Sequence, residues 1–320
     1  MKKIFLFLFF ILIITGCNKK KREYEIIDDN IYFGSYPQTL ELEKKEELDN
    51  LIKKYPNDDN DKSWNSFNYY INGEIEAFMY YIDIDFDNDG NNDYRGIYFY
   101  KYRPQTTLED SNIEKSRQDD NNYFINNLYW FKYEKIKWRI LEDEKNSYMI
   151  MADLIVDSQD YYSENGNAEF MHNGGVGYSN NYELSNIRKW LNDDFYNTAF
   201  KYSEKKIILK KEVDNSAKTT LSPKNPYYCN NTFDNVFLLS HQDALRKYFE
   251  TDSDRQAIAT DYAKCQGVML GSNGNAYWRL RSPYINFVYY DTYINERGEI
   301  YNRNITNTCY GIRPVIWIDK

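Results

Sequence analysis

Two residue types that build catalytic and metal sites are scarce in this chain of 320 residues, which contains two histidines and four cysteines. With only His172 and His241 available, a histidine-rich metal site is excluded. The cysteines lack Cys-x-x-Cys spacing, and neither a Gly-x-Ser-x-Gly motif nor a phosphate-binding loop is present. Zinc-dependent, serine-hydrolase and nucleotide-dependent reactions therefore have no motif in this sequence.

The chain also lacks an excess of positive charge, because its formal net charge is −9. Proteins that bind nucleic acid usually carry a basic surface, so a nucleic-acid partner is not expected. The one long apolar run, from Ile4 to Ile14, is shorter than the roughly 20 residues that a membrane-spanning helix needs. The sequence therefore does not predict a protein that spans a membrane.

The first seventeen residues have the order of an export signal. Lys2 and Lys3 precede the apolar run, and Thr15-Gly16-Cys17 follows it. The Cys after these small residues resembles the lipobox of bacterial lipoproteins, which implies that residues 1–16 are removed and that Cys17 is lipidated. The alternative is an ordinary cleaved signal peptide with Cys17 as a bystander. With lipidation, residues 17–30 form a tether to the bacterial cell membrane or outer membrane.

The rest of the composition predicts a folded protein. The chain is 42% hydrophobic and 18% aromatic, with 33 tyrosines, so it can form a core. The abundance of tyrosine has two possible causes. One is an AT-rich coding sequence, and the other is a Tyr-lined binding surface. The length fits one large or two modest domains. We expect a β-hairpin-rich extension over residues 31–122 and a second domain over residues 123–320.

The pattern of elements predicts an α+β fold, because strands and helices do not alternate regularly. Residues 74–102 are expected to form a hairpin with an acidic turn. We expect two strands around a turn at 129–131 and 136–141, a long loop over 157–184, and a helix after Ser185. Further helices are predicted from the Ser240-x-x-Asp243 start signal and over residues 255–265. Strands are expected from Tyr277 to the C-terminus.

Four segments together carry a family resemblance, and they are residues 131–141, 185–192, 278–283 and 311–315. They resemble a bacterial surface-domain family of unknown function found in lipoproteins and cell-wall proteins. That family is similar to C-type-lectin-like domains, including the formylglycine-generating enzymes. The resemblance implies a twisted antiparallel sheet, a few helices, and a Trp-x-Leu-Arg-Ser-Pro strand beside the Gly-Ile-Arg-Pro strand. The lectin sugar–calcium signature and the paired cysteines of the enzymes are absent, so neither activity is transferred.

An acidic segment in the predicted hairpin turn is a candidate metal site. Asp85, Asp87, Asp89 and Asp93 alternate with other residues, and Gly90 permits the sharp turn of an EF-type loop. Ca²⁺ is therefore the one cofactor that the sequence suggests. The match ends at the twelfth position, where Gly96 replaces the expected Glu. The alternative is a polar hairpin turn without a metal, since Asp, Asn and Gly are also turn residues.

The C-terminal strands supply a candidate ligand-binding set. Arg279, Arg281 and Arg313 could converge on an anionic group, and Trp278 could serve as a stacking surface for a sugar. The alternative is structural, with the arginines paired to carboxylates on neighbouring strands and the tryptophan in the core.

These observations predict a lipid-anchored envelope protein with a non-catalytic domain that binds a glycan, a peptide or a protein. One alternative is an envelope enzyme such as a cell-wall or glycan hydrolase, which a cleft with two close carboxylates would favour. The other is a structural or assembly lipoprotein, which a large exposed apolar patch would favour.

Overall fold

The structure is a computed structural model that describes residues 22–52, 55–56, 63–71, 74–103, 116–162, 169–172, 175–304 and 309–320. The signal peptide, Cys17 and the tether up to residue 21 lie outside the described residues. Within the described ranges, no helix is long and apolar enough to cross a membrane.

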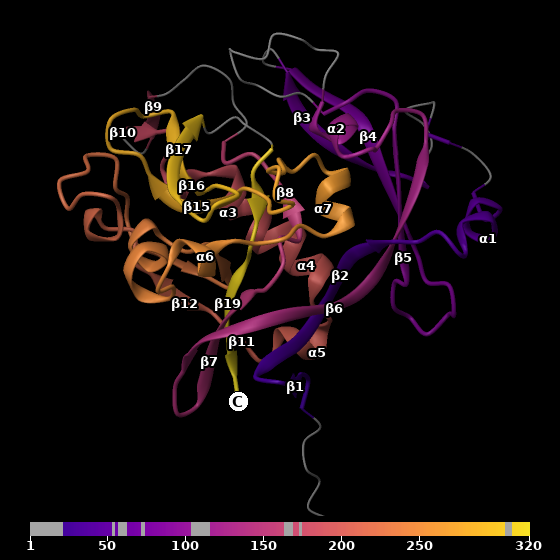
Figure 1. Cartoon of the computed structure of the whole chain (residues 1–320), viewed down its shortest axis with the longest axis horizontal. Coiled ribbons are helices and arrows are strands. Elements are labelled where there is room, and N and C mark those ends of the chain that lie inside the picture. Colours follow the sequence, from indigo (N-terminus) through magenta and orange to yellow (C-terminus); the bar gives the residue numbers. More distant parts are fainter. Residues whose placement is uncertain are drawn as a thin grey trace, which may run out of the picture.

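One large sheet runs through the molecule (Figure 1). Its strands are, in spatial order, β11 (Ile208–Leu209), β19 (Val315–Asp319), β7 (Ser147–Ala152), β6 (Leu128–Asp143), β5 (Tyr94–Phe99), β4 (Glu74–Ile84) and β3 (Asn65–Ile71). Off this path, β2 (Asn30–Leu40) pairs with β6 and β1, β1 (Glu25–Ile27) pairs with β2, and β14 (Val236–Phe237) pairs with β19. All of these pairings are antiparallel. The hairpin expected over 74–102 is confirmed as β4 and β5.

The longest strand, β6, corrects one prediction. Residues 129–141 were expected to form two strands around a turn, and they form a single strand. Lys132 pairs with Tyr94 of β5, and Glu134 pairs with Tyr36 of β2, so the presumed turn lies inside the ladder. Neighbouring strands therefore keep this polar stretch extended, which the local sequence does not reveal.

A second sheet supports the C-terminal motifs. It contains β17 (Ile300–Asn304), β16 (Tyr290–Ile294), β15 (Trp278–Pro283), β18 (Gly311–Ile312) and β8 (Asp157–Ser158), in this order. Trp278 of β15 pairs with Gly311 of β18 in parallel. The prediction that these two motif strands are neighbours is therefore confirmed.

The helices are short, and their predicted start signals are confirmed. The Ser185 hydroxyl accepts from the backbone N–H of Arg188, and α3 (Asn186–Trp190) begins there. Ser240 and Asp243 cap each other reciprocally at the start of η4 (Asp243–Lys247). The helix expected over 255–265 is two helices, α6 (Asp252–Arg255) and α7 (Asp261–Cys265), because Thr260 caps a new start.

The remaining elements lie between these strands along the chain. They are α1 (Lys45–Asp49), α2 (Arg117–Asp120), β9 (Glu169–His172), β10 (Gly175–Tyr178), η1 (Tyr182–Leu184), η2 (Leu191–Phe195), α4 (Tyr196–Ala199), α5 (Tyr202–Lys205), β12 (Lys211–Val213), η3 (Ala217–Thr219) and β13 (Thr232–Asp234). The loop expected over 157–184 thus contains β8, the β9–β10 hairpin and η1. Mixed helices and antiparallel strands make the fold α+β.

Buried contacts join the two predicted domains. Strands on both sides of residue 123 are hydrogen-bonded in the large sheet. The Tyr36 hydroxyl donates to Asp157 Oδ2 at 2.6 Å, and the Trp138 indole donates to the Phe33 carbonyl at 2.7 Å. The division at residue 123 stays a prediction about independent folding units.

The molecule has two distinct ends in Figure 1. The C-terminus, β1, α5 and the turn between β6 and β7 lie at one end. The opposite end carries β9, β10 and the outer strand β17 of the second sheet. The described chain starts at the first end, opposite the β9–β10 hairpin.

Candidate functional site

A cluster of four aromatic rings lies on the turn between β15 and β16. We call Tyr284, Phe287, Tyr289 and Tyr290 the aromatic turn. The centroid of the Phe287 ring lies 5.3 Å from that of Tyr290, and the Tyr289 centroid lies 5.0 Å from that of Tyr290. Phe287 is 45% exposed and Tyr289 is 41% exposed. These rings offer a large apolar area to a ligand in solvent.

A buried asparagine holds the backbone of the aromatic turn in place. The side-chain amide of Asn180, which has no exposed surface, donates to the carbonyls of Phe287 and Tyr290. The Asn180 backbone N–H donates to the Val288 carbonyl at 3.1 Å, and the Ser179 hydroxyl donates to the same carbonyl. Because the backbone is held at several points, the rings are presented by an ordered turn rather than by a free loop.

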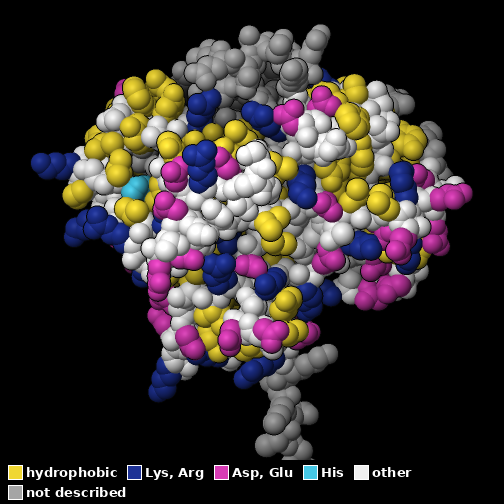
Figure 2. All heavy atoms as spheres, in the orientation of Figure 1, with side chains coloured by type: hydrophobic (Ala, Val, Ile, Leu, Met, Phe, Trp, Pro, Cys, Tyr) yellow, Lys and Arg dark blue, Asp and Glu magenta, His cyan; other side chains and the backbone are white. Residues whose placement is uncertain are grey.

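More exposed apolar residues continue the surface. Tyr178 of β10 packs against Tyr227 with ring centroids 5.1 Å apart. Val176 and Tyr228 are each 56% exposed. Figure 2 shows hydrophobic side chains gathered at the end of the molecule where Figure 1 has β9 and β10.

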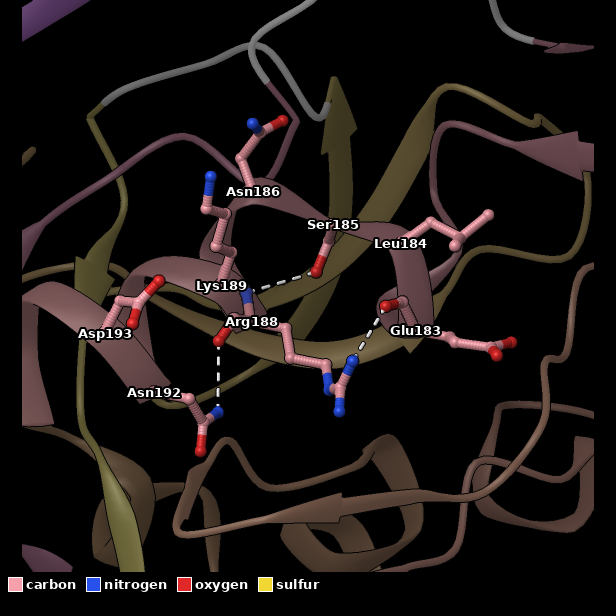
Figure 3. A pocket seen from close by; sticks show the side chains of 8 residues that line it. All are labelled: Glu183, Leu184, Ser185, Asn186, Arg188, Lys189, Asn192 and Asp193. Carbon is pink, nitrogen blue, oxygen red and sulfur yellow. Dashed lines mark hydrogen bonds between the residues drawn. The ribbon is translucent and has the colours of Figure 1, made fainter. Parts of the chain in front are cut away.

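A polar pocket of about 400 Å³ lies around the start of α3 (Figure 3). Its lining residues are Glu183, Leu184, Ser185, Asn186, Arg188, Lys189, Asn192 and Asp193. The Arg188 guanidinium donates to Asp234 and to the Glu183 carbonyl, so it is held in one orientation. The Lys189 side chain is exposed, and the Asn186 side chain points outward beside it in Figure 3. The pocket therefore offers charged and amide groups rather than an apolar wall.

The pocket and the aromatic turn are linked by one short segment. Residues 178–184 run from β10, beside the aromatic turn, to η1, beside the pocket. Asn192 in the pocket wall also has a structural role, because its amide donates to the Val236 carbonyl and accepts from the backbone N–H groups of Asn235 and Val236. The last residue of the 185–192 motif thus fixes β14 against the helix.

The acidic loop brings three of its four predicted ligands together. Carboxylate oxygens of Asp85, Asp87 and Asp89 all lie within 4.8 Å of one another. Asp93 instead accepts from the backbone N–H groups of Phe86 and Asp87, which closes the turn. The Asp85 carboxylate also accepts from the backbone N–H of Gly90 at 2.9 Å. Both interpretations, a Ca²⁺ loop and a polar turn, fit this geometry, and the metal stays a prediction.

The predicted ligand-binding arginines and tryptophan are all buried. Trp278 and Arg279 have no exposed surface, Arg313 is 1% exposed and Arg281 is 5% exposed. Each guanidinium has protein partners that explain its burial. This burial fits the structural alternative, and ligand binding by these residues stays a prediction.

These partners are specific. Arg279 forms an ion pair with Asp291 of β16, which is also fully buried. Arg281 forms an ion pair with Asp243 at 3.0 Å. Arg313 donates to the carbonyls of Ala152 and Asp153, and its guanidinium lies 4.8 Å from the centroid of the Trp278 ring. Burial, with a smaller contribution from Arg139, lowers the pKa of Arg313 to about 9.

Among the residues that the structure describes, two carboxyl groups have strongly raised pKa values, and both are buried. Burial raises the pKa of Asp157 to about 6, and it does the same for Asp291. Neither lines the polar pocket. Cys229, Cys265 and Cys309 are all buried free thiols, and burial raises the pKa of each. The His172 side chain lies outside the described residues.

The abundance of tyrosine permitted a tyrosine-lined surface but did not show where it lies. The signal was the run of rings directly after the Trp-x-Leu-Arg-Ser-Pro strand, at Tyr284, Phe287, Tyr289 and Tyr290. Asn180 gave no signal, because its partners are main-chain carbonyls more than a hundred residues away.

Comparison with known proteins defines the class of this protein. Residues 1–18 match the prokaryotic membrane lipoprotein lipid attachment site. The protein is therefore an exported, lipid-anchored envelope protein, and the predicted attachment is confirmed. Residues 145–320, more than half of the chain, match a family model described as a domain of unknown function, DUF6273. The chain belongs to this family. No curated protein and no solved structure matches it, and the lectin-like similarity finds no support in these comparisons.

Proposed function

We propose that this protein is a non-catalytic receptor for glycan chains of the bacterial cell surface, and that the aromatic turn contacts them. The observation that carries the proposal is the ordered set of rings at 284–290, in which Phe287 and Tyr289 are exposed and the backbone is fixed by the buried amide of Asn180. Flat rings pack against the C–H faces of pyranose sugars, and tyrosine hydroxyls add hydrogen bonds at the ring edge.

The polar pocket suits the same ligand class. A sugar chain resting on the aromatic turn carries hydroxyl and amide groups, and the pocket offers Lys189, Asn186 and Asp193 as partners. The segment 178–184 joins the two features, so a ligand of several sugar units could contact both. An ordered turn also limits the conformational entropy that binding would cost.

The position of the turn fits a receptor of the envelope. The lipid anchor precedes the end with β1, and the aromatic turn lies beside β10, at the other end (Figure 1). A protein held by its N-terminus would therefore present the rings away from its own membrane, toward the cell wall or the exterior.

A pull-down with isolated cell-wall glycan and surface polysaccharide tests the proposal. The full lipidated chain in detergent is compared with the Phe287→Ala/Tyr289→Ala double variant. Loss of two stacking rings should weaken binding about tenfold. Tyr202→Ala is the matched control, since Tyr202 is 79% exposed but lies on α5 at the opposite end. Equal binding by all three proteins would refute the role of the aromatic turn.

The two other candidate functions are outcomes of the same experiment. Glycan that is cleaved rather than retained would identify an enzyme. Concentration-dependent self-association that disappears in the double variant, without glycan binding, would identify an assembly protein.

A C-type-lectin-like arrangement of residues 123–320 is a separate part of the proposal. Its support is the mixed α+β class and the pairing of β15 with β18. An experimental structure that superposes on no lectin-like domain would contradict this part and leave the glycan proposal standing.

A further inference from the structure

The surface around α5 is rich in positive charge and lies next to the start of the fold. Residues 201–206 contain Lys201, Lys205 and Lys206, and Lys201 and Lys206 are exposed. The one carboxylate of this segment, Glu204, is buried and accepts from the Lys201 backbone N–H. Segment 201–206 therefore presents lysines to solvent without an exposed acid of its own.

An exposed tyrosine lies in the middle of these lysines. Tyr202 is 79% exposed, the largest exposed fraction among the described large apolar residues. The Lys206 ammonium lies 4.4 Å from the centroid of its ring. Tyrosine beside lysine is typical of side chains at a membrane–water interface, where the ring meets acyl chains and the hydroxyl meets water.

The length of the tether keeps this surface near the bilayer. The Ser203 hydroxyl donates to Glu23 Oε2 at 3.0 Å, so α5 contacts a residue six positions after Cys17. Six residues span at most about 22 Å even when fully extended. A lipidated Cys17 therefore holds α5 close to the headgroups.

The neighbouring turn between β1 and β2 has the opposite charge. Asp28 and Asp29 are both exposed there, and Glu25 is exposed on β1. An anionic lipid surface attracts lysines and repels these carboxylates within a Debye length. The two sides of this end of the molecule therefore differ in their affinity for such a surface.

We propose that the α5 surface, formed by Lys201, Tyr202, Lys205 and Lys206, docks on the anionic headgroups of the membrane that holds the lipid anchor. The domain is then tilted, with α5 against the lipid and the Asp28–Asp29 turn lifted from it. This contact sets the direction in which the aromatic turn faces relative to the membrane. The proposal does not depend on which ligand the aromatic turn binds.

Site-specific labelling of the full lipidated chain tests the tilt. A fluorophore is attached to Tyr202→Cys, Asp28→Cys or Tyr289→Cys, and the protein is inserted into vesicles that contain nitroxide-labelled lipid. The three buried thiols have raised pKa values, so the new cysteine reacts selectively. We expect stronger quenching at 202 than at 28 or 289 in vesicles of phosphatidylcholine and phosphatidylglycerol in equal parts. Pure phosphatidylcholine should remove the difference between 202 and 28.

Charge reversal supplies the matched comparison. Lys201→Glu/Lys206→Glu in the labelled protein should abolish the excess quenching, since each lysine contributes about fivefold to partition on an anionic surface. Lys218→Glu/Lys224→Glu makes the same charge change at exposed positions away from α5 and should have no effect. Lys205→Cys gives a second label on the surface if Tyr202→Cys folds poorly. Equal quenching at 202 and 28 in anionic vesicles, or quenching unchanged by the Lys201/Lys206 reversal, would overturn the proposal.

Discussion

The side-chain amide of Asn180 donates to the carbonyl of Phe287 at 3.2 Å, and Asn180 has no exposed surface. The most exposed ring of the aromatic turn thus depends on a residue that cannot touch a ligand. The same amide also donates to the Tyr290 carbonyl at 3.2 Å.

Asn180→Ala should therefore weaken glycan binding without removing a ring. Two carbonyls lose their donor, so we also expect a loss of about 1–3 kcal/mol in the free energy of unfolding. Denaturant titration and the glycan pull-down measure the two effects. Asn127→Ala is the control, because Asn127 is an exposed amide that donates to the Phe124 carbonyl and does not line the polar pocket. Full binding by a destabilised Asn180→Ala would show that the order of the turn is irrelevant.

The buried pair of Tyr36 and Asp157 predicts a pH effect on stability. Burial raises the pKa of Asp157 from 3.8 to about 6 in the folded protein, so the folded state holds this proton more tightly than the unfolded chain. The stability from this group is present below pH 4 and is lost as the pH rises through 6. At about 1.4 kcal/mol per pKa unit, the loss is about 3 kcal/mol.

Asp157→Asn should remove this dependence. The unfolding free energy of both proteins is measured between pH 4 and 7. As the pH rises, the natural protein should lose stability relative to the variant. Asp291 has a raised pKa and remains in both proteins, so the subtraction isolates Asp157. Parallel pH profiles for the two proteins would contradict the assignment.

The ion pair of Arg279 with Asp291 predicts that the effects of substituting these two residues on stability are not additive. Arg279→Met leaves a buried carboxylate without its partner, which should cost about 3–5 kcal/mol of stability. Adding Asp291→Asn should recover part of this loss, because the buried charge is removed. Recovery is incomplete because Arg279 also donates to the Gln159 carbonyl and lies 5.1 Å from the centroid of the Tyr310 ring. Additive effects in a double-mutant cycle would contradict a direct interaction.

The acidic loop is tested by thermal melts in EDTA and in millimolar Ca²⁺. If the loop binds Ca²⁺, the melting temperature should rise. A ligand at a free concentration of a hundred times its Kd adds about 2.7 kcal/mol to the stability of the folded state. Asp87→Asn/Asp89→Asn should abolish the rise. Asp193→Asn/Asp194→Asn serves as the control for two carboxylates lost elsewhere. No shift with Ca²⁺ would identify the loop as a polar turn.

Local signals in the sequence predicted local structure well. Ser185 caps its helix, Ser240 and Asp243 cap each other, and α7 ends two residues before Gly267, whose φ is +88°. These features depend on neighbours in sequence and on a backbone angle that favours glycine. The motif strands at 278–283 and 311–315 are neighbours, as the family resemblance implied.

Features that depend on distant partners were predicted less well. The strand β6 continues through 132–135 because β2 and β5 lie on either side. The arginines of the C-terminal motifs have charge patterns that suit a ligand, yet their partners Asp291 and Asp243 and several carbonyls enclose them. A sequence shows which groups need a partner but not whether the protein or a ligand provides it.

Hydroxyl-radical footprinting with bound glycan tests the central claim most directly. The full chain is oxidised with and without cell-wall glycan, and the modification of each exposed ring is read by mass spectrometry. We expect protection of Phe287 and Tyr289, with Tyr202 equally oxidised in both states. Bound glycan that leaves Phe287 and Tyr289 as reactive as in the free protein would contradict it.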